Sequence, residues 1–298
     1  MKLGKLGVWN AFDEFTAAAG ANMARRIEQW GYSAIWLPEA LGRDVIAQSA
    51  WLLANTSALI VAPGIANIYG RDPMMMHAGQ LGLAEQSGGR FLLGLGVSHP
   101  RIVSDVRGHD FGKPVETMRR YLGAMKTSPY LAPAPAIAPR TVIAALGPKM
   151  LALSRDDADG AHPYNVSPAH TAMARGILGP GKLLCVEQKV VLETDPDRAR
   201  DAARQALRFY IGISTYQNNW LRMGFTAADF ENGGSDRLID DTIAWGDEAA
   251  IIQRIEQHWE AGADHVCLQT IRADRPVGER GFACIDEKLL ASLARLNR

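Results

Sequence analysis

Short apolar runs alternate with longer segments whose apolar residues recur at helical spacing along almost the whole chain. The runs predict strands at 6–9, 34–37, 59–66, 91–97, 141–146, 184–192 and 266–271, with a further short strand just before His162. The amphipathic segments predict helices at 17–30, 45–55, 73–87, 114–126, from 148, 169–178, 196–212, 247–261 and 287–296. Strand–helix alternation predicts a parallel sheet, and about eight such units predict an α/β fold of the (β/α)8 TIM-barrel type.

Glycine, proline and acidic residues mark the element boundaries. Gly31 follows one predicted helix, and Asp72-Pro73 provides an N-cap acid and a proline at the first helical position of another. Pro63 and Gly64 are awkward inside a strand. Residues 130–139 (YLAPAPAIAP) are too proline-rich for regular structure and predict a stiff surface connection. Residues 214–245 are long and mixed, so we expect an insertion of short helices before the last helix–strand unit.

One domain over residues 1–298 accounts for this pattern, because α/β barrels commonly run to about 250 residues as a single unit. The alternative is an open doubly wound sheet, which needs a glycine-rich nucleotide turn after the first strand. The residues after that strand, Asn10-Ala11-Phe12, form no such turn.

Composition narrows the class of protein. Lys plus Arg and Asp plus Glu both number 32, so no net field recruits nucleic acid or an anionic membrane. No apolar stretch reaches the ~18 residues of a membrane span, and the N-terminus lacks an apolar leader. The cysteines, Cys185, Cys267 and Cys284, form no CxxC pair, as expected in a reducing compartment. We therefore expect a cytoplasmic protein.

Candidate chemistry is sought where barrel strands end, because active sites of this fold lie at the carboxyl ends of the strands. Glu39 follows the second strand, where it can position a ligand, exchange protons, or pair with Arg43. Asn67 follows the third strand. Its side-chain amide offers both a donor and an acceptor to a ligand, and the alternative is that it only caps a turn. Gly94 and Gly96 share one face of the fourth strand and leave room for a flat ring, and His99 comes next, as the best titrating candidate.

Two further strand ends offer walls for a ligand. Gly147-Pro148-Lys149 opens a helix, so that free backbone N–H groups and one cation suit a phosphate, although proline at a helix start is also an ordinary turn. Gly160-Ala161-His162 ends the sixth strand. The sequence contains no HExxH, CxxC or GxSxG motif, and its histidines show no ligand spacing, so no metal site is expected.

Several stretches, in their order and spacing, resemble the luciferase-like monooxygenase superfamily, and within it the oxidoreductases that use the deazaflavin coenzyme F420. The similarity extends over nearly the whole chain and is carried by WLPE (36–39), GIAN (64–67), RDP (71–73), GGRF (88–91), GLGVSH (94–99), LGPKM (146–150), VEQKVVL (186–192) and AGADHV (261–266).

The resemblance implies a barrel that binds F420 or FMN with the tricyclic ring at the strand mouths. It implies a cis peptide bond between Gly64 and Ile65 against the ring, and ring contacts from Asn67, Val97 and Ser98. By the same resemblance, Gly147, Pro148, Lys149, Gly160 and Ala161 would hold the ribityl-phosphate side. In the sugar-phosphate dehydrogenase branch a histidine follows the strand-two acid and a glutamate donates the proton; those positions here are Ala40 and His99. That substrate is therefore not expected, and His99 either replaces the glutamate or shapes the pocket.

The leading hypothesis is an F420-dependent oxidoreductase that transfers hydride to or from a small organic substrate, with His99 and Glu39 as candidates for proton transfer. Alternatives are an FMN-dependent monooxygenase and a non-catalytic binding protein on the same barrel. Arg43, Arg71, Lys149 and Arg155 could build a basic groove for the acidic tail of F420, and Trp9, Tyr69, Tyr216 and Trp220 could stack on the substrate.

A homodimer is also expected from the resemblance. Apolar residues on the helices after the second and third strands either form its interface or pack on the barrel: Ile46, Trp51, Leu52, Leu53, Met74, Met75 and Met76. The sequence leaves the substrate and the direction of hydride transfer open.

Overall fold

The protein is built on a barrel of parallel strands, which the computed structural model describes for residues 1–275 and 285–297. Neighbouring strands follow the order β3-β2-β1-β10-β8-β7-β6-β5-β4, and a parallel bridge from Val61 to Phe91 closes the circuit. β3 and β4 are two parts of one barrel strand, so eight positions surround the axis and the predicted (β/α)8 barrel is confirmed. The strands are β1 (Leu6–Trp9), β2 (Ala34–Leu37), β3 (Ile60–Pro63), β4 (Ala66–Asn67), β5 (Leu92–Gly96), β6 (Arg140–Ile143), β7 (Gly160–Ala161), β8 (Leu183–Leu192) and β10 (His265–Ile271).

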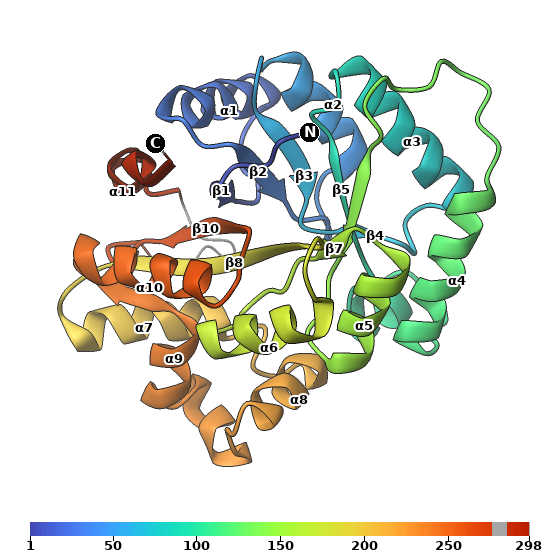
Figure 1. The fold of residues 1–298 in the computed structure, drawn as a ribbon. Coiled ribbons are helices and arrows are strands. Elements are labelled where there is room, and N and C mark those ends of the chain that lie inside the picture. The colour runs from blue at the N-terminus through green and yellow to red at the C-terminus, as the bar shows by residue number, and fades with distance from the viewer. Residues whose placement is uncertain (276–284, 298) are drawn as a thin grey trace.

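Helices surround the barrel on its outer side (Figure 1). Side chains at the position before the first turn start many of them: Thr16, Asp44, Asp72, Asp195, Asp247 and Asp286 each accept a backbone N–H of their own helix. Gly31 ends the first helix with φ 97°, a conformation that favours glycine. The helices are α1 (Ala17–Trp30), α2 (Val45–Ala54), α3 (Pro73–Gln86), α4 (Pro114–Thr127), α5 (Pro148–Asp157), α6 (Pro168–Leu178), α7 (Pro196–Leu207), α10 (Glu248–Glu260) and α11 (Glu287–Leu293).

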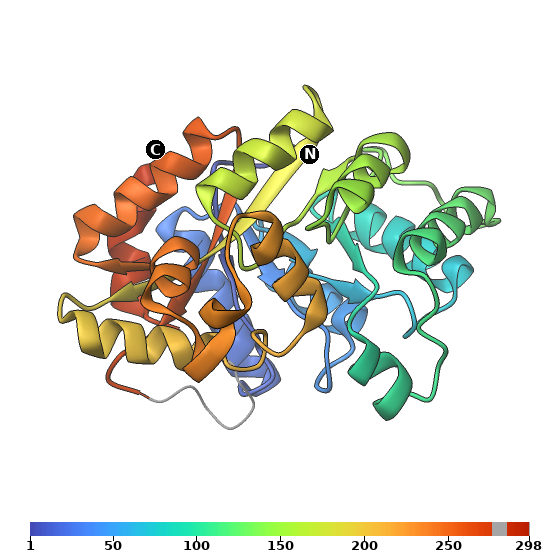
Figure 2. The same ribbon diagram turned by 90° about the horizontal axis from the view of Figure 1, so that it is seen from below.

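The inserted segment lies outside this ring of helices, next to α6 and α7 (Figures 1 and 2). As predicted, it consists largely of short helices: α8 (Ser214–Arg222), the 3₁₀ turn η2 (Ala227–Gly233) and α9 (Asp236–Thr242). Its end differs from the prediction, because β9 (Ala244–Gly246) pairs in parallel with β8. β8 is long enough to extend beyond its barrel neighbours, and its free edge accepts this extra strand.

Two local features were not predicted. The third barrel strand is interrupted at Gly64 and Ile65, so that it forms β3 and β4 instead of one run over 59–66. The π-helix η1 (Arg101–Val106) follows the loop after β5. Both lie at the ends of strands that surround the candidate site.

The barrel interior is packed with side chains and is not a pore. Trp9, Trp36, Ile60, Leu92 and Val142 meet there with Cys185 and Cys267, both unpaired and buried as expected. Cys284 lies outside the described residues. Gly94 is required by this packing, because a Cβ atom at that position would lie 2.0 Å from the carbonyl oxygen of Pro63. Glycine at this position therefore allows the third and fourth barrel strands to approach each other closely.

The helices after the second and third strands bury part of their apolar surface. Leu52, Leu53 and Met76 are buried against the barrel, whereas Trp51, Met74 and Met75 are 46%, 49% and 57% exposed. Among the described residues, no helix has the length and apolarity that crossing a membrane requires.

Candidate active site at the carboxyl ends of the strands

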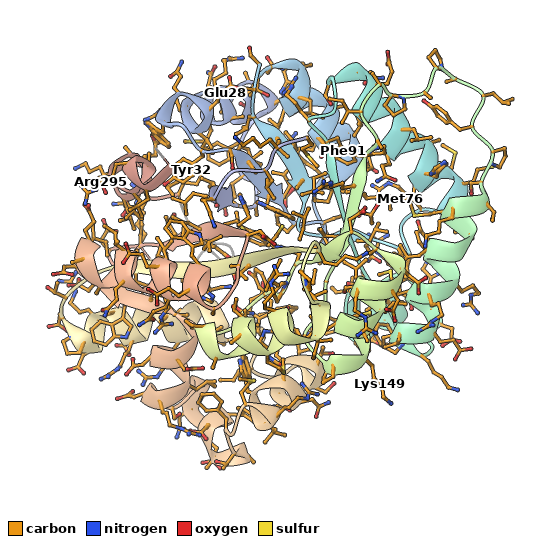
Figure 3. The ribbon with its side chains drawn as sticks, in the orientation of Figure 1. Glu28, Tyr32, Met76, Phe91, Lys149 and Arg295 are labelled. Atoms are coloured by element: carbon orange, nitrogen blue, oxygen red, sulfur yellow. The ribbon has the colours of Figure 1, made fainter. Side chains whose placement is uncertain are left out.

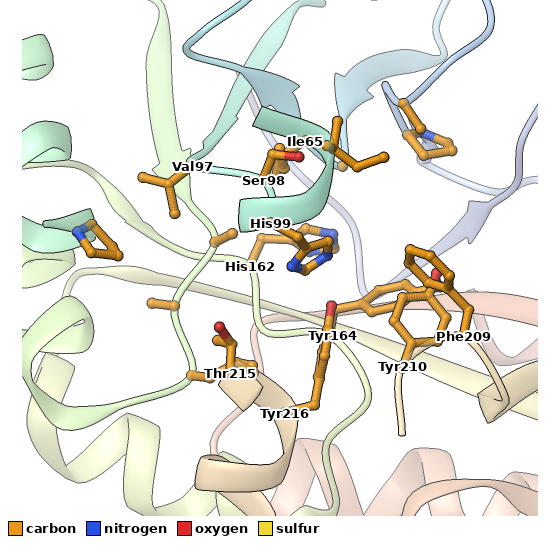
Figure 4. Close-up of a pocket in the computed structure, with 18 of the residues that line it drawn as sticks. Ile65, Val97, Ser98, His99, His162, Tyr164, Phe209, Tyr210, Thr215 and Tyr216 are labelled. Carbon is orange, nitrogen blue, oxygen red and sulfur yellow. The ribbon is translucent and has the colours of Figure 1, made fainter. Parts of the chain in front are cut away.

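A cavity of about 1330 Å³ opens where the barrel strands end. Loops from both sides of the barrel contribute to it, and so do α7 and the start of the insertion (Figure 4). Ligand pockets commonly measure about 300–1,000 Å³, so this cavity is large enough for a cofactor together with a substrate. Of the predicted site residues it is lined by Glu39, Gly64, Ile65, Val97, Ser98, His99, Gly147, Pro148 and Lys149.

One wall is an apolar slot at the ends of the third and fourth barrel strands. The peptide bond between Gly64 and Ile65 is cis, as the resemblance implied. The indole Nε1 of Trp9 donates to the carbonyl of Gly64 over 3.2 Å. A Cβ atom at Gly96 would lie 2.4 Å from Ile65 Cδ1, so the glycine makes room for this side chain. Ile65, Val97 and Ser98 lie together on this side of the cavity (Figure 4).

Glu39 lines the cavity, but both of its carboxylate oxygens have protein partners. Arg71 donates to both of them, over 2.6 and 2.9 Å. The backbone N–H groups of Val45 and Asn67 donate one bond to each, over 3.2 and 2.9 Å. The ion-pair partner is Arg71, and not Arg43, which the sequence offered as one alternative. This arrangement fixes α2 and β4 in place and favours a structural role for Glu39 over proton transfer.

Three predicted ligand contacts lie away from the cavity lining. Asn67 is fully buried, and its side-chain oxygen accepts the N–H of Tyr69 over 2.9 Å. Gly160 and Ala161 are buried in β7, where a Cβ atom at Gly160 would lie 2.0 Å from the carbonyl oxygen of Leu183. In the structure these residues shape the strands behind the site.

His99 is brought to the cavity as predicted. Ser98 before it has φ 57°, in the left-handed region, which turns the chain sharply at the end of β5. The imidazole of His99 lies 5.7 Å from the Tyr216 ring and 6.3 Å from the Phe209 ring, between ring centres. Its Nδ1 is buried without a hydrogen-bond partner among the described residues. Burial lowers the pKa of His99 below 6.5, so the imidazole is neutral at neutral pH.

The part of the cavity beside the start of α5 carries positive charge. Gly147 precedes α5, which begins with Pro148, and no side chain caps this helix start. Lys149 is exposed in the first turn of α5 (Figure 3), and Arg222 of α8 lies 3.6 Å from where a Cβ of Gly147 would be. Of the four basic residues expected to form a groove, only Lys149 lines the cavity; Arg71 and Arg155 are engaged in ion pairs elsewhere. Arg208 and Arg222 are the cations that sequence reasoning missed, because both belong to or border the insertion.

His162 and Tyr164 line the cavity from the end of β7, the strand end that was expected to offer a wall for a ligand, although neither residue was given a role. The His162 ring stacks on Trp36 with 4.3 Å between ring centres, and its Nδ1–H donates to the carbonyl of Cys185 over 2.8 Å. Burial lowers its pKa to about 4, so its Nε2 is a neutral acceptor facing the base of the cavity near Gly64. The sequence signal was their position directly after β7.

The ring of Tyr164 contacts a buried ion pair formed by Lys189 and Glu187. Lys189 Nζ lies 3.8 Å from the centre of the Tyr164 ring and 3.2 Å from a Glu187 carboxylate oxygen. Both charged side chains are only 1% exposed.

Of the residues expected to stack on a substrate, Trp9 and Tyr216 line the cavity, whereas Tyr69 and Trp220 pack elsewhere. Among the described residues, no group of His, Cys, Asp and Glu is arranged to hold a metal ion.

This barrel, with a large cavity at the carboxyl ends of its strands, defines an enzyme-like site of the TIM-barrel class. A model of the luciferase-like monooxygenase family matches residues 3–265. The chain therefore belongs to this family, as the resemblance in the sequence implied.

Individual relatives are similar over nearly the full length. A Mycobacterium tuberculosis protein that carries the name coenzyme F420-dependent oxidoreductase is 26% identical, with 96% of this chain and 99% of that protein covered. The solved structure of an F420-dependent tetrahydromethanopterin reductase from Methanopyrus kandleri has a TM-score of 0.73 at 18% identity, over 99% and 98% of the two chains. That of an F420-dependent secondary alcohol dehydrogenase has a TM-score of 0.74 at 14% identity, over 99% and 98%. At these identities the two structures show the shared fold.

Proposed function

We propose that this protein is an F420-dependent oxidoreductase that transfers hydride between the deazaflavin and a small organic substrate. The observation that carries the proposal is the lining of one cavity, which combines an apolar slot, His99 and a cationic helix start. The names of the Mycobacterium tuberculosis relative and of the two solved structures support F420 as the cofactor.

The residues present fit such a cofactor. Ile65 and Val97 provide apolar contacts for a flat ring, and Gly96 keeps Ile65 in position. Lys149, Arg222 and the uncapped start of α5 supply the donors and positive potential that a phosphodiester requires. When bound, F420 supplies the hydride chemistry, and the protein's own residues orient it and exclude water.

His99 is the group that would exchange a proton with the substrate. Its lowered pKa means that it is a neutral base at pH 7. In the direction of alcohol oxidation it would accept the hydroxyl proton, so kcat/KM should rise with pH through the lowered pKa and be level above about pH 6.5. In the direction of reduction His99 must first be protonated, so the rate should fall over the same range. His99→Ala should abolish either pH dependence.

A titration of the purified protein with F420 and, separately, with FMN tests the cofactor, followed by ligand fluorescence. We expect micromolar binding of F420 and weaker binding of FMN. Lys149→Ala should weaken F420 binding, whereas Lys126→Ala is a control, because Lys126 pairs with Asp157 on the outer helices. His99→Ala tests whether the imidazole contributes to cofactor binding.

The other outcomes of this titration are equally informative. Preference for FMN would replace the proposal with the FMN-dependent monooxygenase. Binding of neither cofactor would favour the non-catalytic binding protein. An unchanged F420 affinity in Lys149→Ala would exclude the start of α5 as the phosphate site.

The proposed assembly is a homodimer, supported by the exposed Trp51, Met74 and Met75 on α2 and α3. Sedimentation equilibrium at micromolar concentration should report twice the chain mass. A monomer would contradict this part of the proposal.

A further inference from the structure

Four aromatic rings in the wall of the cavity contact one another in a closed circuit, which we call the aromatic box. It consists of His99, Phe209, Tyr210 and Tyr216, which come from the loop after β5, the end of the α7 segment and the insertion (Figure 4). The ring centres of successive members lie 5.2 to 6.3 Å apart. Tilted and edge-on contacts at such distances are the favourable geometries of aromatic pairs. The box is therefore a preformed surface.

The aromatic box carries no charge at neutral pH. Burial lowers the pKa of His99 and raises the pKa values of Tyr210 and Tyr216, so all three are neutral. Two of the cavity's charged groups have partners outside the box: Glu39 pairs with Arg71, and Asp13 accepts the backbone N–H of Arg43.

The cavity nevertheless leaves large apolar side chains uncovered. Phe209 is 47% exposed and Leu41, in the loop after β2, is 69% exposed, and both line the cavity. Covering such surface is favourable by about 25 cal/mol per Å². Burying an unpaired ionised group against it would instead incur a desolvation penalty.

We infer that the aromatic box is the substrate site, and that its substrate is a neutral, largely apolar molecule bearing a ring, with the reacting carbon next to His99. The inference rests on the proposed function for the role of the cavity, but the preference for neutral ligands follows from the box alone. It predicts that sugar phosphates and other anionic substrates bind the box more weakly than neutral ones. The cations Lys149 and Arg222 at the start of α5 remain for the cofactor.

Two probes that differ in one charge test this inference: benzyl alcohol and 4-carboxybenzyl alcohol. Their dissociation constants are measured by ligand-observed NMR, on the protein alone and with F420 added. The neutral probe should bind at least about ten-fold more tightly, a difference of about 1.4 kcal/mol. Phe209→Ala should weaken the neutral probe by a similar factor. Phe15→Ala is the matched control, because Phe15 packs on Phe12 and does not line the cavity.

The possible results test the inference about the aromatic box separately from the proposed function. Equal binding of both probes, or preference for the anion through the neighbouring Arg208, would overturn the inference even if F420 binds. An equal effect of the Phe15 and Phe209 variants would also overturn it, since the loss would then be structural. Absence of F420 binding would refute the proposed function, while the probe preference of the protein alone would still test the box.

Discussion

Mild acid should destabilise this protein strongly, because four of its histidines are buried in the neutral form. Burial lowers the pKa of three of them to about 4 and of the fourth to about 3. Each has at least one hydrogen bond that fixes it, such as the Nε2–H of His170 to the carbonyl of Leu146 over 2.9 Å. The four are His162, His170, His258 and His265, all at most 1% exposed.

The size of the effect follows from proton linkage. An unfolded histidine with a pKa of 6.5 takes up its proton as the pH falls below that value, whereas the native one stays neutral until about pH 4. Stability is thus fully present above the unfolded pKa and is lost as the pH falls toward the native one. Between about pH 7.5 and 5.5 each histidine lowers the free energy of unfolding by about 1.4 kcal/mol. Four of them give about 5 kcal/mol, comparable with the whole stability of many domains.

Urea unfolding followed by circular dichroism at several pH values, at constant ionic strength, measures this loss. Most carboxylates contribute little above pH 5.5, because their ordinary pKa values lie near 4. Burial raises the pKa values of Glu187 and Asp241, and these two groups act in the opposite direction to the histidines. His170→Gln keeps an N–H donor for Leu146 and removes one titrating group, so the loss should fall to about 4 kcal/mol. A total loss below about 1.4 kcal/mol in the parent protein would show that the four histidines are not held neutral, and would refute the reasoning.

Two further predictions concern packing and buried charge. Gly94→Ala should prevent stable folding or lower the free energy of unfolding by several kcal/mol, since its Cβ would lie 2.0 Å from a backbone oxygen. Gly123→Ala is the comparison: no atom lies within 4 Å of its Cβ position in α4, so it should raise the free energy of unfolding by about 0.5–1 kcal/mol. Thermal unfolding of the pair compares them, and equal melting temperatures would contradict the close approach. Lys189→Met should cost about 3–5 kcal/mol because it leaves Glu187 buried without its cation. Adding Glu187→Gln should restore part of that stability in chemical denaturation, and a purely additive loss would argue against the coupling.

The periodicity of the sequence determined the barrel and most of its elements. Helix starts such as Asp72-Pro73 and ends such as Gly31 depend on local hydrogen bonds and backbone conformation, so they are visible in a few neighbouring residues. The position of His99 and of the Gly147-Pro148-Lys149 turn at the cavity also followed from the sequence. In a parallel barrel all strands end at the same face, so a residue after a strand is placed once the strand is recognised.

The tertiary structure alone decided which side chains meet. Glu39 pairs with Arg71, 32 residues further along the chain, although Arg43 is much nearer in the sequence. Arg222 reaches Gly147 from 75 residues further along the chain, and Phe209 and Tyr216 close the aromatic box on His99. Such partners depend on how the insertion packs across the barrel mouth, and no local pattern in the sequence encodes that packing. The sequence by itself therefore determined the fold and the face that carries the site, whereas the charge and shape of the cavity came from contacts between distant segments.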